Sequence, residues 1–241
     1  MNRGKGESSI RIATYNVHKC RGMDRRVDLE RIATVIESLQ ADVVAVQEIL
    51  HAEGVKSQVC FLAERLQYKF SFGENRTHRG VPYGNATFSR FPIVAEKNYD
   101  ITWRGRERRG CLRTDIRLRN RSILHVFNVH MGTSYFERPH QARLLFGDAL
   151  AKTTQLAGPR VVVGDFNEWT RGIASALMHN EFASVDAKLR KRTFPGILPL
   201  FQLDHFYFDP NMQLDKFAIV RSPLAKLASD HLPLIADFEI G

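Results

Sequence analysis

VVVGDFNEW, residues 161–169, is the stretch on which the interpretation of this sequence depends. Three β-branched residues are typical of a buried strand, and the strand ends at a glycine that is followed by Asp165 and Asn167. Turns favour these residue types, because glycine adopts unusual backbone angles and the Asp and Asn side chains bond nearby backbone. The same residues also suit a reactive centre at the carboxyl end of a strand. The rest of the chain must separate the two interpretations.

The composition is that of an ordinary globular protein. The chain has 241 residues, of which 44% are hydrophobic, and this length fits one large domain or two small ones. No Pro/Gly/Ser-rich linker, low-complexity tract or repeat of fixed period marks a boundary. We therefore predict a disordered tail over residues 1–9 and a single domain over residues 10–241.

The expected location is the cytoplasm. The first ten residues, MNRGKGESSI, are polar and lack the apolar core of a signal peptide. No transmembrane segment is expected, because no apolar run approaches the roughly 20 residues that span a bilayer. Three widely separated cysteines, Cys20, Cys60 and Cys111, indicate reduced thiols rather than a disulfide framework. We expect a soluble monomer.

The chain is strongly basic, with a formal net charge of +9. Such a surface suits a polyanionic partner: nucleic acid, a phosphorylated small molecule or an anionic membrane. Basic residues gather in WRGRERRGCLR (residues 103–113) and in KLRKR (residues 188–192). Each run taken alone is as consistent with a solvated face as with a binding site.

Short apolar runs and amphipathic segments mix along the whole chain. Strands are predicted at residues 10–15, 43–47, 86–88, 123–128, 161–163, 203–208 and 234–238. Helices are predicted at residues 29–39 with Asp28 as N-cap, 57–67, 139–156 and, more weakly, 171–178. The strand at 123–128 follows earlier strands with no helix between them. The order favours two mixed β-sheets packed face to face with helices on the outer faces, rather than a doubly wound parallel sheet.

Polar residues stand where most of these apolar runs begin or end. They are Asn16, Glu48, Asn128, His130, Asp165, Asn167, Asp204, His205, Asp230 and His231. A turn explains one such event but not the whole set. Because strand ends share the edge of a sheet, we expect these groups to converge on one rim.

Carboxylates, amides and imidazoles without a thiolate cluster suit a hard cation such as Mg²⁺, or Mn²⁺. Glu48 and Asp230 are its predicted ligands. Asp165 can hold an attacking water, and His231, oriented by Asp204, can stabilise phosphorane charge or act as an acid. The uncharged amides of Asn16 and Asn167 can hold phosphate oxygens, which completes a set of groups for in-line attack of water on a phosphoester.

At this point the sequence resembles the endonuclease/exonuclease/phosphatase superfamily, with its deoxyribonuclease I-like fold. The matching pieces, in the family's order, are ATYNVH, VVAVQE, GNATFSRFPI, FNVHMG, VVVGDFNEW, QLDHFYF and SDHLPL, and they span residues 10–240. Each motif alone is only suggestive, but QE, GDFN and a terminal SDH in the correct order are highly specific. The resemblance implies a four-layer α/β sandwich with the site at one end of the paired sheets.

The resemblance also implies catalytic roles. Asp165 and Asn167 correspond to the pair that positions the nucleophile and binds phosphate. Asp204 corresponds to the residue that orients the last histidine, His231. His130 belongs to the N-x-H motif, whose histidine stabilises the transition state or acts as a general acid.

Further residues are implied to bind metal or substrate. Glu48 corresponds to the metal-binding Glu, and Asp230 to the Asp on the metal side. Asn16 corresponds to the phosphate-orienting Asn, and Asn128 of the N-x-H motif and Asn85 of GNATFSR are grouped with it as substrate-binding residues. The Arg-rich loops contribute Arg79, Arg108 and Arg109 as candidate phosphate contacts, with ordinary surface charge as the alternative.

Some positions depart from the family's patterns. NVHMG differs from the tyrosine-centred motif of the apurinic-site exonuclease branch, so base-excision repair is disfavoured. His18 stands where some members carry a second acid, which leaves open whether it contacts metal or substrate or only a neighbour of the site. His205 should face away from Asp204 and is expected to pack. Trp169 is either a stacking group or a lid packed on its own loop.

Three functions compete. A nuclease acting on DNA or RNA is favoured by the basic charge and the Arg-rich loops. A phosphoesterase for a phospholipid headgroup, an inositol phosphate or another small molecule is the alternative, and FPGILPLF (residues 194–201) is an apolar loop that can touch lipid. A non-catalytic scaffold is disfavoured, because Glu48, Asp165 and His231 are all present.

Overall fold

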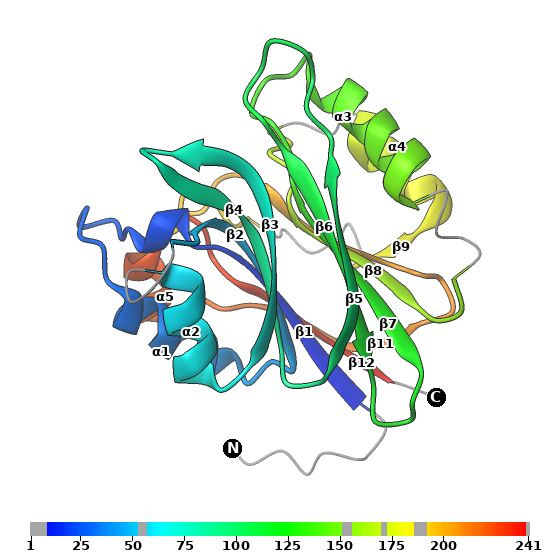
Figure 1. Cartoon of the computed structure of the whole chain (residues 1–241), viewed down its shortest axis with the longest axis horizontal. Helices are drawn as coiled ribbons and strands as arrows, with labels where there is room; N and C mark the ends of the chain where they lie inside the picture. Colours follow the sequence, from blue (N-terminus) through cyan, green and yellow to red (C-terminus); the bar gives the residue numbers. More distant parts are fainter. Residues whose placement is uncertain (1–8, 53–56, 151–155, 170–172, 186–191, 240–241) are drawn as a thin grey trace.

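The chain folds as two six-stranded mixed β-sheets that face each other, with helices outside them (Figure 1). This is a computed structural model, and it describes residues 9–52, 57–150, 156–169, 173–185 and 192–239. The first sheet has the order β11-β12-β1-β2-β4-β3. Its strands are β1 (Ser9–Asn16), β2 (Val43–Leu50), β3 (Lys69–His78), β4 (Val81–Ser89), β11 (Gln213–Ile219) and β12 (Leu234–Glu239). Only β1 and β2 run parallel to each other.

The second sheet has the order β5-β6-β7-β8-β10-β9. Its strands are β5 (Ile93–Asp100), β6 (Gly110–Arg117), β7 (Ile123–His130), β8 (Arg160–Asp165), β9 (Ala183–Ser184) and β10 (Asp204–Phe208). Here β7 and β8 are the parallel pair, and the other neighbours are antiparallel.

Helices cover the outer face of each sheet (Figure 1). The first sheet carries α1 (Leu29–Leu39), α2 (Gln58–Leu66) and α5 (Pro223–Ala228), and the second carries α3 (Arg138–Leu144), the π-helical continuation η3 (Leu145–Leu150) and α4 (Ile173–Glu181). Helix α1 begins as expected, because the Asp28 side chain accepts a hydrogen bond from the Arg31 backbone N–H. Among the described residues, no helix combines the length and the apolar character needed to cross a bilayer.

The apolar side chains form three layers of core between four layers of structure. Along β8, Val161 and Val163 point into the space between the sheets, whereas Val162 points outward to α3 and α4. This alternation is the period of a β-strand, and here both faces are covered. The predicted four-layer sandwich is confirmed.

The predicted elements are present, and others accompany them. All seven predicted strands appear, and β3, β5, β6, β9, β11 and α5 are additional. The predicted helix at 139–156 is seen as far as Leu150, and α4 is described from Ile173. Residues 1–8 of the predicted tail and residues 188–191 of KLRKR lie outside the described residues, and the first strand begins at Ser9.

A buried amide joins the two sheets near one end of the sandwich. The Nδ2 of Asn128, on β7, donates to the Val46 carbonyl at 3.0 Å and to the Ala86 carbonyl at 2.9 Å, both in the opposite sheet. Its Oδ1 accepts from Gln47 Nε2 at 2.8 Å. Asn128 has no exposed surface, so these three hydrogen bonds between the sheets are buried away from solvent.

We predict that Asn128→Ala lowers the free energy of unfolding by about 1–3 kcal/mol, because the Val46 and Ala86 carbonyls and the Gln47 amide each lose a buried hydrogen bond. Urea denaturation followed by circular dichroism measures the change. Asn211→Ala, at an exposed asparagine, is the matched control and should leave stability unchanged. Equal stability of the two variants would show that the amide does not hold the sheets together.

Candidate active site

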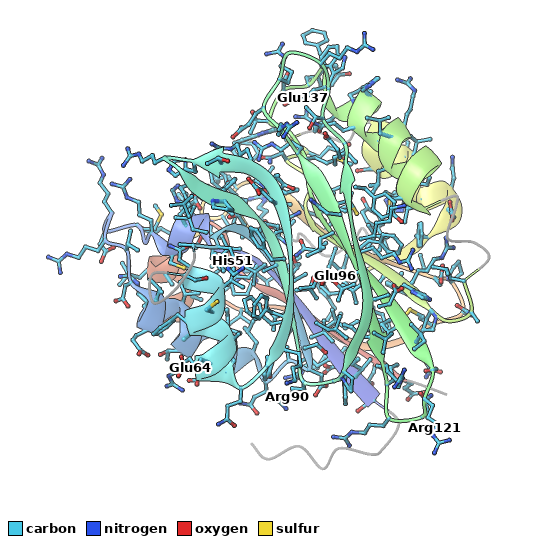
Figure 2. All side chains as sticks on the ribbon, in the orientation of Figure 1. His51, Glu64, Arg90, Glu96, Arg121 and Glu137 are labelled. Atoms are coloured by element: carbon cyan, nitrogen blue, oxygen red, sulfur yellow. The ribbon has the colours of Figure 1, made fainter. Side chains whose placement is uncertain are left out.

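The polar strand ends meet at one end of the sandwich. On β7, His130 continues the inward-facing row of Val126 and Asn128, and on β8 Asp165 continues the row of Val161 and Val163. Asp165 is the Cα partner of both His130 and Asp204 in the register of neighbouring strands. Figure 2 shows that Glu137, in the segment after β7, lies at the opposite end of the molecule from Arg90 and Arg121. We call the end with Asp165 and His130 the catalytic end.

The structure explains why VVVGDFN carries Gly164, Asp165 and Asn167 after its three valines. Gly164 has φ +137°, and a Cβ there would lie 2.0 Å from the Val129 carbonyl oxygen, so only glycine allows β8 to approach β7. Asn167 has φ +48°, a left-handed conformation that Asn tolerates. Its backbone N–H donates to Asp165 Oδ1 at 2.8 Å, and its side chain donates to the Met131 carbonyl. The turn and the candidate site are therefore the same structure.

Asp165 is the centre of the group. It is buried, and its Oδ2 accepts a hydrogen bond from Asn16 Nδ2 at 3.0 Å. The same oxygen lies 3.7 Å from His231 Nε2 and 3.8 Å from His130 Nε2. Burial raises the pKa of Asp165 to about 7, against the lowering influence of the His231 charge. This carboxyl group can therefore exchange a proton near neutral pH.

His231 is held by the predicted orienting residue. Its Nδ1 lies 2.9 Å from Asp204 Oδ2, and both side chains are buried. Burial alone would lower the pKa of His231, but the charges of Asp204 and Asp165 outweigh burial and raise that pKa to about 10. At neutral pH the ring is therefore an imidazolium with Nε2 directed at Asp165.

His130 is in the opposite state. Arg109 Nη1 lies 2.9 Å from His130 Nε2 and 3.1 Å from Nδ1, and both residues are buried. Burial and the charge of Arg109 hold the pKa of His130 well below its ordinary value. Arginine only donates, so the neutral ring must accept from it. One histidine of the site is therefore charged and the other is neutral.

Glu48 reaches the site from a β-bulge. The pairing of β2 with β4 shifts between Val46 and Ile49, and Glu48 has φ +58°, a strained conformation for this residue type. Its Oε2 accepts from Lys19 Nζ at 2.9 Å, and its Oε1 lies 3.3 Å from Asn16 Nδ2 and 3.8 Å from His130 Nε2. Burial would raise the pKa of Glu48, but the charge and the hydrogen bond of Lys19 hold that pKa well below the ordinary range. Glu48 is thus an ionised carboxylate at the site.

A left-handed turn contributes two more groups. His18, Lys19 and Cys20 all have positive φ, and the His18 backbone N–H donates to Asn16 Oδ1 at 3.0 Å. This turn directs Lys19 to Glu48 and brings His18 Nδ1 to 3.5 Å from Asp230 Oδ1. Strained backbone of this kind persists only where its surroundings hold it, which is common at functional sites.

The donor set fits a hard divalent cation. Glu48 and Asp230 are only partly buried, with side chains 20% and 28% exposed. Glu48 already binds one positive charge in the structure, because the Lys19 ammonium lies 2.9 Å from its Oε2. Asp165, Asp204 and His231 also form a tight acidic group. The His231–Asp204 bond occupies Nδ1 of that group, so Glu48 and Asp230 remain the better oxygen donors for Mg²⁺ or Mn²⁺.

The other predicted substrate-binding residues lie in varied places. Asn85 and Asn128 are buried, and the amide of Asn85 donates to the Gly110 and Asn128 carbonyls. These contacts favour a supporting role for both asparagines. Arg79 is exposed in the turn between β3 and β4, and Arg108 is exposed in the loop before β6. Of the three predicted arginines, Arg109 is the one that contacts a catalytic candidate.

The expectations for His205 and Trp169 can be compared with the side chains that surround them. The His205 ring packs against Phe166 and stacks on Tyr207, as expected for the face opposite Asp204. Trp169 packs edge-on against Phe194 and Phe201, which belong to the loop at residues 194–201 and not to its own loop, and its side chain remains partly exposed.

Sequence analysis missed Lys19, Tyr83 and Arg76. Tyr83 is a neighbour of Glu48, whose charge adds to burial in raising the pKa of Tyr83, and the Arg76 guanidinium lies 4.5 Å from the centre of the Tyr83 ring. A signal for Tyr83 existed, because it stands two residues before Asn85 on the same face of β4. Nothing in the sequence indicates Lys19, whose position depends on the left-handed turn. Glu107 also escaped notice: its carboxylate lies 2.7 Å from Arg76 Nε and 2.8 Å from Arg109 Nη2.

We predict that the His231 imidazolium persists well above pH 7 and that Asp204→Asn lowers its pKa, because the raising charge is removed. Nuclear magnetic resonance titration of the ring measures this directly. Asp209→Asn, at the other end of β10, is the control and should leave the His231 pKa unchanged. A wild-type ring that titrates near 6.5 would contradict the assignment.

Comparison with known proteins agrees with this geometry. The model of the Endonuclease/Exonuclease/phosphatase family matches residues 13–231. An uncharacterised protein of Escherichia coli K12, YbhP, is 30% identical, with 96% of this chain and 97% of YbhP covered.

Solved structures share the fold at lower identity. A functionally unknown conserved protein of Enterococcus faecalis V583 has a TM-score of 0.82 at 19% identity, covering 96% of this chain and 100% of that one. The Bacteroides thetaiotaomicron mannosyl-6-phosphatase Bt3783 has a TM-score of 0.80 at 17% identity, covering 95% and 99%. The matched residues include every strand end that meets around Asp165, and the chain belongs to the Endonuclease/Exonuclease/phosphatase family, a family of hydrolytic phosphoesterases.

Proposed function

We propose that this protein is a divalent-metal-dependent phosphodiesterase that uses in-line attack of water. The observation that carries the proposal is the buried Asp165 carboxylate, with a charged imidazolium 3.7 Å away on one side and a neutral imidazole 3.8 Å away on the other. A carboxyl group with a pKa of about 7 and an imidazolium with a pKa of about 10 provide a base and an acid at neutral pH.

Asp165 is the proposed base. Its carboxylate accepts a proton from water as the water oxygen forms its bond to phosphorus. Asn16 and the Asn167 backbone fix both carboxylate oxygens, so the base is oriented before substrate binds. The uncharged amides of Asn16 and Asn167 are proposed to bind phosphate oxygens as well.

His231 is the proposed acid. As the bond from phosphorus to the leaving oxygen breaks, His231 gives its Nε2 proton to that oxygen, and the products are a phosphomonoester and an alcohol. Asp204 holds the ring at Nδ1 and stabilises its charged form. The proton taken by Asp165 can then return to His231 across 3.7 Å, which restores the starting state.

His130 and Arg109 are proposed to stabilise charge on the phosphate. The pair is buried at the edge of the site, and its guanidinium is anchored to Glu107. Glu48 and Asp230 would hold Mg²⁺ or Mn²⁺, which neutralises the charge on phosphate oxygens when bound. Arg109 donors serve the same purpose from the protein's side.

The choice of substrate rests on charge and on the loops around the site. Nucleic acid is the first substrate to test, because the net charge is +9 and exposed arginines lie in the loop before β6. A phospholipid headgroup or an inositol phosphate is the second candidate, favoured by exposed apolar side chains near the catalytic end. A scaffold without catalysis is disfavoured by the complete set around Asp165.

We predict that Asp165→Ala and His231→Ala each reduce the turnover of bis(p-nitrophenyl) phosphate by at least about 100-fold, because the base or the acid is lost. The assay contains Mg²⁺ or Mn²⁺, and circular dichroism verifies folding. His179→Ala, at an exposed histidine on α4, is the control and should keep wild-type turnover. Near-normal turnover in either folded site variant would defeat the assignment.

We predict that Glu48→Gln raises the Mg²⁺ concentration for half-maximal activity by at least about tenfold, because a charged oxygen ligand becomes neutral. The measurement is a Mg²⁺ titration of bis(p-nitrophenyl) phosphate hydrolysis. Glu64→Gln, on the exposed face of α2, should leave the titration unchanged. An unaltered titration in Glu48→Gln would remove Glu48 from the metal site.

Nicking of supercoiled plasmid DNA tests the first substrate. Metal-dependent nicking that is absent in His231→Ala would establish a nuclease. Hydrolysis of bis(p-nitrophenyl) phosphate without nicking of plasmid would support the proposed phosphodiester hydrolysis and exclude this DNA substrate. Phospholipids and inositol phosphates are then the substrates to assay with the same preparation.

A further inference from the structure

Exposed apolar side chains are concentrated at the catalytic end. Seven of the thirteen large apolar residues that are exposed in the described part of the chain lie within 135–136, 169 and 197–201. We call six of them the apolar rim: Tyr135, Phe136, Ile197, Leu198, Leu200 and Phe201. Single exposed apolar residues are normal on protein surfaces, but a concentration of them marks an interaction site.

The second part of the rim is a closed loop that rests on the catalytic motif. Its base is held by backbone hydrogen bonds between Phe194 and Phe201. The Gly196 N–H donates to the Asp230 carbonyl at 2.7 Å, and the Phe194 ring lies 5.0 Å from the His231 ring. At its tip, Ile197 and Leu198 are 57% and 66% exposed. The loop is fixed at its base, yet it presents aliphatic side chains to solvent beside His231.

The first part of the rim lies on the other side of Asp165. Tyr135 and Phe136 follow β7, are 61% and 72% exposed, and pack edge-on against each other. The loop beneath them is tied down, because the Ser134 N–H donates to the buried Glu137. Strand β8, which ends at Asp165, lies between β7 and β10, and the Ile197 loop leads into β10. The two parts of the rim therefore stand on either side of the strand that presents the catalytic carboxylate.

Positive charge accompanies the rim. Arg104, Arg106 and Arg108 are exposed in the loop that precedes β6, and β6 starts at the catalytic end because Gly110 pairs with His130. Trp103 of that loop lies 6.1 Å, ring to ring, from His140, just after the Tyr135 segment. Arg221 is exposed and donates to the Arg192 carbonyl, immediately before the second loop. Apolar tips and arginines thus occupy the same end of the molecule.

We propose that the apolar rim and its arginines dock the catalytic end onto an anionic phospholipid bilayer, so that a headgroup phosphodiester meets Asp165. Aliphatic tips enter hydrocarbon, the aromatic pair suits the interface, and the arginines meet anionic headgroups. The docking surface stands by itself, whereas the choice of a phospholipid as substrate rests on the proposed function.

A bilayer fits these features better than other partners. Nucleic acid is bound by cations and by aromatic stacking, and the tip of the Ile197 loop offers only aliphatic side chains. A protein that covered both parts of the rim would close the space above Asp165. A bilayer that contacts the same two parts supplies its own headgroups to that space.

The test is co-sedimentation with vesicles in the absence of divalent cation, so that binding is measured without catalysis. We expect the wild-type protein to pellet with vesicles of equimolar phosphatidylcholine and phosphatidylglycerol, and much less with phosphatidylcholine alone. Leu198→Asp and Phe136→Asp should each weaken binding by at least about tenfold, since withdrawing one large apolar side chain from hydrocarbon changes an equilibrium by that factor. Val94→Asp, at an exposed valine in β5, is the matched control and should bind normally.

Three outcomes would overturn the proposal. The first is failure of the wild-type protein to pellet with anionic vesicles. The second is equal pelleting of the rim variants and the wild type. The third is tighter binding of a DNA duplex that Leu198→Asp abolishes. Hydrolysis of bis(p-nitrophenyl) phosphate by the same preparations separates the two ideas: hydrolysis without vesicle binding removes the docking surface, and vesicle binding without hydrolysis removes the proposed catalysis.

Discussion

The Asn128 amide is the contact on which the rest of the site depends. It binds the Val46 and Ala86 carbonyls across the space between the sheets, and Gln47 binds it in return. Apolar side chains fill the remainder of that space and set its width, but they pack without direction. A directional bond next to His130 fixes how the two sheets are aligned at the end where their polar residues must meet. Candidate catalytic groups from two sheets therefore share one geometry.

That geometry sets protonation states that the same residues would not have in water. Asp165 is buried among groups that donate to it, and its two histidine neighbours differ in charge because Asp204 faces one and Arg109 faces the other. The imidazolium beside Asp204 and the neutral ring beside Arg109 are thus consequences of two partners on β10 and before β6. Two chemically identical side chains thus acquire two protonation states from their environment, as the proposed acid–base catalysis at neutral pH requires.

Sequence alone located the residues at strand ends and not those that depend on backbone detail. Asp165, Asp204 and His231 could be predicted, because they follow or precede apolar runs whose ends share an edge. Lys19 could not be predicted. It lies in a turn of three consecutive left-handed residues, none of which is the glycine that would indicate such a turn in the sequence. Strand β5 was missed because its exposed polar residues weaken the apolar pattern, and β6 was missed because buried Thr114 and Asp115 interrupt its apolar residues. The sequence shows which loops are rich in arginine, but it does not show which arginine contacts His130, because that contact depends on the conformation of the loop before β6.

Net charge and the rim bear on the partner in different ways. A charge of +9 attracts any polyanion, so it raises the local concentration of nucleic acid and of anionic lipid alike. The apolar rim does not share this ambiguity, because exposed leucine and isoleucine gain nothing from a phosphate backbone and gain from hydrocarbon. Both parts of the rim are held by tied-down loops beside β7 and β10, so docking would bring no new ordering cost for their backbone. Charge brings the protein to an anionic surface, and the rim selects a surface that has hydrocarbon beneath it.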